Sequence, residues 1–186
     1  VVRTKQSLQE ALQRLVERKP FSTLSITEIT AEAGLDRTTF YLHYRGIHEL
    51  MDALAAALFA DLHQAIYGAN PWEAIRQPTA LMGYVETVFT HLEEHRAFYR
   101  SVLGSQGDPY FKELFQAMLS ELLFEPFADP VLFKKDNSSE LIIRFYVSGF
   151  TGIATWWLEK NIPMDARKAS QQISEKILPG YLQLLG

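Results

Sequence analysis

The stretch GLDRTTFYLHYRGIHEL, residues 34–50, decides the fold of this chain. It follows SITE, residues 25–28, a capping-box pattern in which a hydroxyl accepts from the first helix amides and a glutamate reaches back. A short helix is therefore predicted between this box and Gly34, which closes it. Asp36 is a good N-cap for a second short helix through about His43. Two short helices joined by a tight glycine-containing turn are the outline of a helix-turn-helix.

Helical spacing continues on both sides of this unit. Leucines at helical intervals predict a helix over Thr4–Arg18, and a leucine at every fourth position predicts a long helix from Gly46 to about Tyr67. We see no β-alternation, so the chain is predicted to be all-α: an N-terminal three-helix helix-turn-helix domain, residues 1–46, and a helical domain, residues 47–186. Further helices are predicted over Thr79–Glu94, Ala97–Leu103, Pro109–Phe124 and Ser139–Lys160, and from Asp165 to Leu184 with a bend at Pro179.

Composition narrows the classes of protein. The chain of 186 residues has no cysteine, which excludes disulfides and thiolate metal sites and suits a reducing cytosol. Its net charge of −4 argues against a protein that coats nucleic acid, but residues 1–50 carry seven Lys/Arg against six Asp/Glu. The basic side chains of this near-neutral N-terminal segment can still lie on one face and bind an anion. No apolar run approaches the length of a membrane span and no signal peptide opens the chain, so we expect no membrane partner.

The second short helix carries side chains suited to DNA. The recognition helix of a helix-turn-helix enters the major groove by its N-terminal end, where Arg37 can fork onto guanine and the next two threonines can reach bases or phosphates. Phe40 is expected to point inward with Leu35, Ile26 and Ile29, and His43 could instead stack on the following helix. Tyrosine and histidine tips, one more arginine and the amides of the first helix suit phosphate. The predicted DNA-binding set is Ser25, Thr27, Arg37, Thr38, Thr39, Tyr41, His43, Tyr44 and Arg45.

These residues also resemble a known family. From Phe21 through LSITEITAEAGLDRTTFYLHYRGIHEL to Leu50, the sequence closely resembles the TetR family of bacterial transcription regulators. The resemblance implies that the two-helix unit binds DNA, with contacts at the positions above other than Ser25 and Tyr44, and that the rest is a helical domain for ligand binding and dimerisation. Many members have a lysine at the position of Ile47, so one phosphate anchor is missing or is supplied by a neighbour, His48 or Arg45. More loosely, ERKPF, FYRSVLG and GFTGIATWWLEKNIP resemble the branch near the dihydroxyacetone-kinase regulators.

The same resemblance implies two sites in the helical body. One is a ligand cavity between the middle helices, although most aromatic residues there simply fill core; the candidate walls are Tyr84, Phe89, Tyr99, Tyr110, Phe111, Phe115 and Trp156. The other is a four-helix dimer interface. Two glycines inside one helix each cost about 1 kcal/mol relative to alanine, which favours close helix approach, either within one chain or between two. The candidate interface residues are Gly149, Gly152, Ile173, Ile177 and Tyr181.

His91-Leu92-Glu93-Glu94-His95 matches H-x-x-E-H, a zinc-protease pattern with two histidines one helical turn apart and a carboxylate as base. A catalytic site also needs a third ligand, and no downstream glutamate stands out. The two histidines lie where one helix is expected to end, so they need not share a helix. A solvated surface pair is the simpler interpretation, and we expect no metal and no cofactor.

Together these features predict a bacterial, cytoplasmic, non-enzymatic regulator that binds a palindromic DNA operator as a homodimer. The usual expectation is a repressor released by a small apolar or amphipathic ligand, although the sequence does not separate repressor from activator. Two alternatives stay open: a zinc hydrolase using His91, Glu94 and His95, and a helical interaction module that has lost DNA binding, with Ile47 as the first sign.

Overall fold

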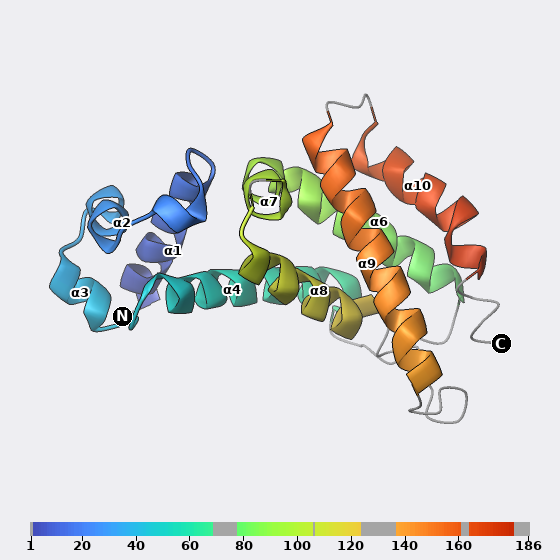
Figure 1. The fold of residues 1–186 in the computed structure, drawn as a ribbon, viewed down its shortest axis with the longest axis horizontal. Coiled ribbons are helices and arrows are strands. Elements are labelled where there is room, and N and C mark those ends of the chain that lie inside the picture. The colour runs from blue at the N-terminus through green and yellow to red at the C-terminus, as the bar shows by residue number, and fades with distance from the viewer. Residues whose placement is uncertain (1, 69–77, 106, 124–136, 161–163, 181–186) are drawn as a thin grey trace. The chain divides into compact units, whose positions relative to one another are not determined.

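The computed structural model describes residues 2–68, 78–105, 107–123, 137–160 and 164–180 (Figure 1). Within these ranges the secondary structure is helical and no strand is present, which confirms the all-α prediction.

The N-terminal elements are the predicted ones. Helix α1 spans Val2–Val16, a short 3-10 turn η1 spans Phe21–Thr23, α2 spans Ile26–Ala33 and α3 spans Arg37–Tyr41. These three α-helices are drawn in blue in Figure 1. Helix α3 ends two residues before the predicted end at His43, although the Tyr44 amide still donates to the Phe40 carbonyl at 3.0 Å.

The helices that follow also match the expected segments closely. The described helices are α4 Ile47–Tyr67, α6 Pro78–Glu94, α7 Arg96–Leu103, α8 Pro109–Leu123, α9 Asn137–Glu159 and α10 Ala166–Lys176. Asp165 caps α10, and its side chain accepts from the Lys168 amide at 2.8 Å. Helix α10 stops at Lys176 and Ile177 is a turn, but residues 178–180 are helical again, so the helical path is interrupted next to Pro179, where the sequence predicts a bend. A proline lacks an amide donor and crowds the preceding helical turn. Leu184 and Tyr181 lie outside the described residues.

The packing of the chain defines two compact units. The first combines Val1–Phe59 with Ala97–Leu114, and the second combines Ala60–Arg96 with Phe115–Gly186. Helices α4 and α8 contribute residues to both, as does α7, whose first residue, Arg96, belongs to the second unit. A functional division after residue 46 stays a prediction.

In the first unit, α1, α2 and α3 pack around a small core. Leu8, Leu12, Ile29, Phe40 and Leu50 are completely buried there. Phe40 and Ile29 are thus core residues as predicted, whereas Ile26 and Leu35 are only partly buried. In the same unit Phe111 of α8 contacts three aromatic residues, with centroid distances of 5.3 Å to Phe98, 6.3 Å to Tyr99 and 6.4 Å to Phe59.

In the second unit, α6 packs against α9 and α10. Phe89 of α6 is fully buried, and its ring lies 5.5 Å from Phe150 and 5.1 Å from Trp157, both on α9. The Tyr67 hydroxyl at the end of α4 donates to the carbonyl of Leu122 in α8. Burial of these rings supplies the apolar area that holds the unit together.

Candidate nucleic-acid interface

The start of α2 is held by the capping box that the sequence predicts. The Glu28 amide donates to the Ser25 hydroxyl oxygen at 3.3 Å, and the Ser25 amide donates to the Glu28 carboxylate at 3.0 Å. Lys19 also bonds this carboxylate. The hydrogen bond from Lys19 and then that from the Ser25 hydroxyl lower the pKa of Glu28 to about 2. The carboxylate therefore stays ionised at neutral pH and keeps the cap closed.

The glycine turn and the second cap set the direction of α3. Gly34 has a left-handed backbone with φ 67°, and the Leu35 amide donates to the Thr30 carbonyl at 2.8 Å, the bond of a Schellman C-cap. Asp36 then accepts from the Thr39 amide at 2.7 Å and from the Thr39 hydroxyl at 3.1 Å. These hydrogen bonds, the backbone one first, lower the pKa of Asp36.

Helix α1 braces the other side of α2. Glu32 accepts from Arg14 at 2.8 Å and from Arg18 at 3.1 Å, and the Arg14 hydrogen bond is the main reason that the pKa of Glu32 is lowered. A pair of arginines on one carboxylate restrains the angle between the two helices. The two-helix unit is thus held by short-range polar contacts over a small core.

Several residues of the predicted set are exposed on α2, on α3 and directly after α3. Arg37 and Thr38 of α3 are exposed, as are Thr27 on α2 and Arg45 after α3. Tyr41 at the end of α3 is 53% exposed, and its ring meets the edge of Phe40 at 5.6 Å. A guanidinium, hydroxyls and a phenol exposed on two adjacent helices are groups that contact DNA bases and phosphates.

Leu42 is an exposed residue that the sequence reasoning missed. It is 76% exposed, directly after α3. Helical periodicity carries a signal for it, because Phe40 is expected to point inward and a residue two positions later on a helix faces away from it. An apolar side chain there is suited to a thymine methyl group.

The structure does not place Tyr44 on this surface. Its ring is only 4% exposed and lies 5.9 Å from the Phe40 ring, with the Lys5 ammonium 5.8 Å from its centroid. Burial raises the pKa of the Tyr44 phenol. A tyrosine four residues after Phe40 extends the same apolar face, so packing outweighs exposure of the hydroxyl.

Two further predicted contacts have hydroxyls that are already engaged. The Ser25 hydroxyl donates to Glu28 at 2.6 Å, and the Thr39 hydroxyl donates to Asp36. Both residues therefore serve the helix caps in this structure. His43 is half-buried in the turn after α3, where its amide donates to the Phe40 carbonyl at 3.0 Å.

Next to Ile47, where many family members have lysine, His48 contacts the rings of Phe21 and Tyr110 in the first unit. We call these three residues the aromatic brace. His48 is exposed, but its ring lies 5.2 Å from Phe21 and 5.6 Å from Tyr110. The Tyr110 hydroxyl donates to Asp52 of α4 at 2.5 Å, and this bond is the main reason that the pKa of Tyr110 is raised. Of the two neighbours suggested as the phosphate anchor, His48 is in ring contact, whereas Arg45 projects into solvent.

The residues predicted as walls of a ligand cavity fall in two groups. Tyr99, Tyr110 and Phe111 belong to the first unit, and Tyr84, Phe89, Phe115 and Trp156 belong to the second. Two of them differ from the expectation of a buried wall: Tyr110 is at the surface and bonded to Asp52, and Trp156 is 49% exposed. The neighbouring Trp157 is the buried tryptophan, and its indole nitrogen donates to the Met164 carbonyl at 2.9 Å.

Helix α9 carries an apolar face that the described residues leave exposed. Phe145 is 73% exposed, and Leu141 and Trp156 on the same face are also exposed. Gly149 and Gly152 lie between them, and among the described residues no atom comes within 4 Å of a Cβ built at either glycine. Close approach within one chain therefore does not explain these glycines in the part of the chain that the structure describes.

The other predicted interface residues differ in their exposure. Ile173 of α10 is buried within its own unit, so it serves the protomer core, while Ile177 is exposed. Tyr181 lies outside the described residues. By length and composition alone, one helical segment of the described residues, Glu140–Glu159, is long and apolar enough to cross a bilayer; core helices of soluble proteins meet the same criterion.

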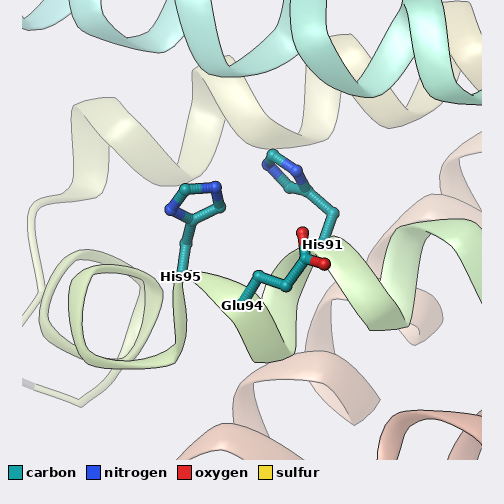
Figure 2. Close-up of side chains that lie close together, drawn as sticks. All are labelled: His91, Glu94 and His95. Atoms are coloured by element: carbon teal, nitrogen blue, oxygen red, sulfur yellow. The ribbon is translucent and has the colours of Figure 1, made fainter.

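The HLEEH segment folds differently from the expected surface pair. Helix α6 ends at Glu94, but the His95 amide still donates to the His91 carbonyl at 3.2 Å, so both rings lie on one side of a continuous turn, 4.8 Å apart (Figure 2). His91 is only 8% exposed. Burial, and then the neighbouring His95, lower the pKa of His91 to about 4, with Asp61 opposing.

Comparison with known proteins agrees with this architecture. Residues 80–178 match the family model TetR_C_8, the transcriptional regulator C-terminal region. A 63-residue stretch is 35% identical to the uncharacterized HTH-type transcriptional regulator YxbF of Bacillus subtilis (strain 168), and it covers 33% of this chain but only 17% of that protein.

Solved structures share the fold over nearly the whole chain. A TetR transcriptional regulator from Streptococcus agalactiae 2603V superposes with a TM-score of 0.70 at 20% identity, covering 94% of this chain and 93% of its own. The dihydroxyacetone kinase operon activator DhaS superposes with a TM-score of 0.66 at 16% identity, covering 99% and 98%. Because the family model spans more than half of the residues, including α6 to α10, and the capped two-helix unit precedes it, the chain belongs to the TetR family of transcriptional regulators.

Proposed function

We propose that this regulator binds a palindromic operator as a homodimer, reading each half-site with α3. The observation that carries this proposal is the exposed row on α2, α3 and the residues after α3, in which Arg37, Thr38 and Tyr41 project from a helix fixed by Asp36 and Gly34. A recognition helix held by its own caps presents these groups without further ordering. Arg37 contacts a base, and Thr27, Tyr41 and Arg45 contact phosphates and fix the register.

The open face of α9 supports the homodimer. Exposed Leu141, Phe145 and Trp156 lie along one helix with Gly149 and Gly152 between them, and an apolar stripe of this kind is unfavourable in water. The glycines leave room for a second helix to approach. A second copy of α9 across a two-fold axis covers the same patch on both subunits. Ile177 of α10 extends this interface in the proposal.

We further propose that the protein is not an enzyme and acts as a repressor released by a small apolar or amphipathic ligand in the helical body. The aromatic side chains of the body support a ligand of this class. DhaS, whose fold is similar, is an activator, so the direction of the response in a reporter assay is part of the test.

The test is binding of purified, untagged protein to DNA fragments that flank its own gene, measured by fluorescence anisotropy at several salt concentrations. Arg37→Ala is expected to weaken binding to the bound fragment by about 1–3 kcal/mol and to relax preference at one position in each half-site, because a forked base contact is lost. Arg100→Ala is the matched control, since Arg100 is an exposed arginine of α7 in the same compact unit.

Two outcomes would count against the proposal. If the protein binds none of the DNA fragments at low salt, the result favours an interaction module that has kept only the shape of a helix-turn-helix. If Arg37→Ala weakens every sequence equally and lowers the salt slope, Arg37 is a phosphate contact and base reading lies elsewhere.

A further inference from the structure

A cluster of potential metal-binding side chains lies at the end of α6, in the second compact unit, whereas the residues proposed to contact DNA belong to the first. One nitrogen of each imidazole of His91 and His95 and one carboxylate oxygen of Glu94 all lie within 4.8 Å of one another. Figure 2 shows both rings pointing to the same side of the chain, with the Glu94 carboxylate beside them. We propose that His91, Glu94 and His95 bind one divalent transition-metal ion, zinc.

The donor set fits this class of metal. Two imidazole nitrogens and one carboxylate oxygen are ligands that zinc accepts, with a fourth position left for water. In a tetrahedron with bonds of about 2.1 Å, ligand atoms are roughly 3.4 Å apart. The distances between the three ligand atoms therefore have to shorten by about 1.4 Å at most. Rotation of the exposed Glu94 side chain and the half-buried His95 side chain can supply this movement.

The charges around the cluster favour a cation. His91 is the buried member of the three, and imidazole nitrogens are common ligands of transition metals. Asp61 of α4 acts on His91 electrostatically, and Glu94 brings a second negative charge. An ion bound here is attracted by both carboxylates in partly desolvated surroundings.

The backbone that carries the cluster is held on both sides. The Glu93 carboxylate accepts from the Ala166 amide at the start of α10 at 3.3 Å. Arg96 donates to the carbonyl of Trp157 at 2.8 Å, and its guanidinium lies 4.6 Å from the Trp157 ring centroid. The neighbours of the three donors are thus tied to α9 and α10, so the donors are presented without ordering of a loop.

Binding at this place has a structural consequence within the second unit. His95 is the single residue between the end of α6 and the start of α7, and the ion joins it to His91 one turn earlier. The metal would therefore hold the last turn of α6 and the residue that follows it together. With Glu94 as a ligand, the carboxylate is not available as the base of a hydrolase, so the site binds metal without the zinc-protease chemistry that the H-x-x-E-H pattern suggests.

The experiment uses untagged, chelator-treated full-length protein titrated with Zn²⁺ by calorimetry and with Co²⁺ by visible absorption. We expect about one ion per chain, d–d bands of four-coordinate Co²⁺, and a thermal midpoint that rises with Zn²⁺. His95→Ala and Glu94→Gln, both at solvent-accessible positions, are each expected to weaken binding at least about tenfold. They test the site even if a change at the buried His91 prevents folding.

His63→Ala is the matched control, because His63 is an exposed histidine of α4 in the same compact unit. Unchanged metal affinity in this control and loss in the other two supports the proposal. Equal affinity in all three variants, or binding of Co²⁺ without four-coordinate bands, overturns it. Retained zinc in Glu94→Gln together with loss of a metal-dependent hydrolytic activity would assign Glu94 as a base and also overturn it. None of these measurements involves DNA, so their outcome is independent of the proposed function.

Discussion

The face of α9 makes a prediction with opposite signs for folding and for association. The perturbation is Gly152→Leu. A glycine inside a helix is about 0.8–1.0 kcal/mol less favourable than alanine, and leucine is close to alanine. Because no atom of the described residues lies within 4 Å of a Cβ at Gly152, the new side chain meets no obstacle among those residues. The protomer should therefore become slightly more stable, by up to about 1 kcal/mol.

Association should change in the other direction. In a two-fold interface the substitution occurs once on each copy, and overpacking costs typically about 1–3 kcal/mol per site. The dimer therefore loses about 2–6 kcal/mol, which corresponds to a rise in the dissociation constant of about 30-fold to about 10⁴-fold. Operator affinity should fall with it, because a monomer reads only one half-site.

The assay is sedimentation equilibrium over a wide range of protein concentration, combined with thermal unfolding at a concentration where both variants are monomeric. Gly83→Leu is the control, since Gly83 is exposed on α6 and a Cβ there also meets nothing within 4 Å in the described part of the chain. Gly83→Leu should show the same gain in helix stability with unchanged association. A Gly152→Leu protein that stays a dimer with wild-type affinity would refute the assignment of α9 as the interface.

Three further predictions concern the first unit. Gly34→Ala should destabilise the protein by about 1–2 kcal/mol in urea unfolding, because φ 67° is costly for a residue with a Cβ; Gly34→Asn should lose less. Ionised Glu28 stabilises the fold fully above its ordinary pKa of 4.5, and this contribution is lost as pH falls towards about 2. Glu28→Gln should therefore flatten that part of the stability-against-pH curve, and an unchanged curve would show that the carboxylate gives no net stabilisation. Tyr110→Phe removes the bond to Asp52 but keeps the ring, so hydrogen exchange should rise in the first turns of α4; unchanged protection would mean that ring packing alone holds the brace.

Much of the two-helix unit follows from interactions between residues that are close in sequence. The Ser25–Glu28 box, the Asp36 cap and the Gly34 turn each involve partners no more than five positions apart. Such contacts depend on residue type and spacing, which can be read from the chain directly. The buried Phe40 and the exposed Arg37 follow from helical periodicity in the same way.

The positions where prediction and structure differ are those at which a side chain has an apolar body and a polar tip, or at which two similar residues are adjacent. Tyr41 and Tyr44 have the same chemistry, but Tyr41 is exposed at the end of α3, whereas Tyr44 is buried against Phe40. Trp156 and Trp157 are separated only by which one faces Phe89 of α6. Residue type does not specify which face of a helix finds a partner elsewhere in the chain.

At the end of α6, the arrangement of polar residues likewise depends on partners that are distant in sequence. From the sequence, His91, Glu94 and His95 form a pattern whose geometry depends on whether the helical turn continues through His95. It does continue, because Glu93 and Arg96 bond groups near Ala166 and Trp157, more than 60 positions away in the chain. Local sequence therefore determined the caps, the turn and the exposed residues of α3 that are proposed to contact DNA. Only the tertiary structure decided which histidine is buried, which tyrosine is core and which face of α9 is left open, because burial depends on partners that are distant in sequence.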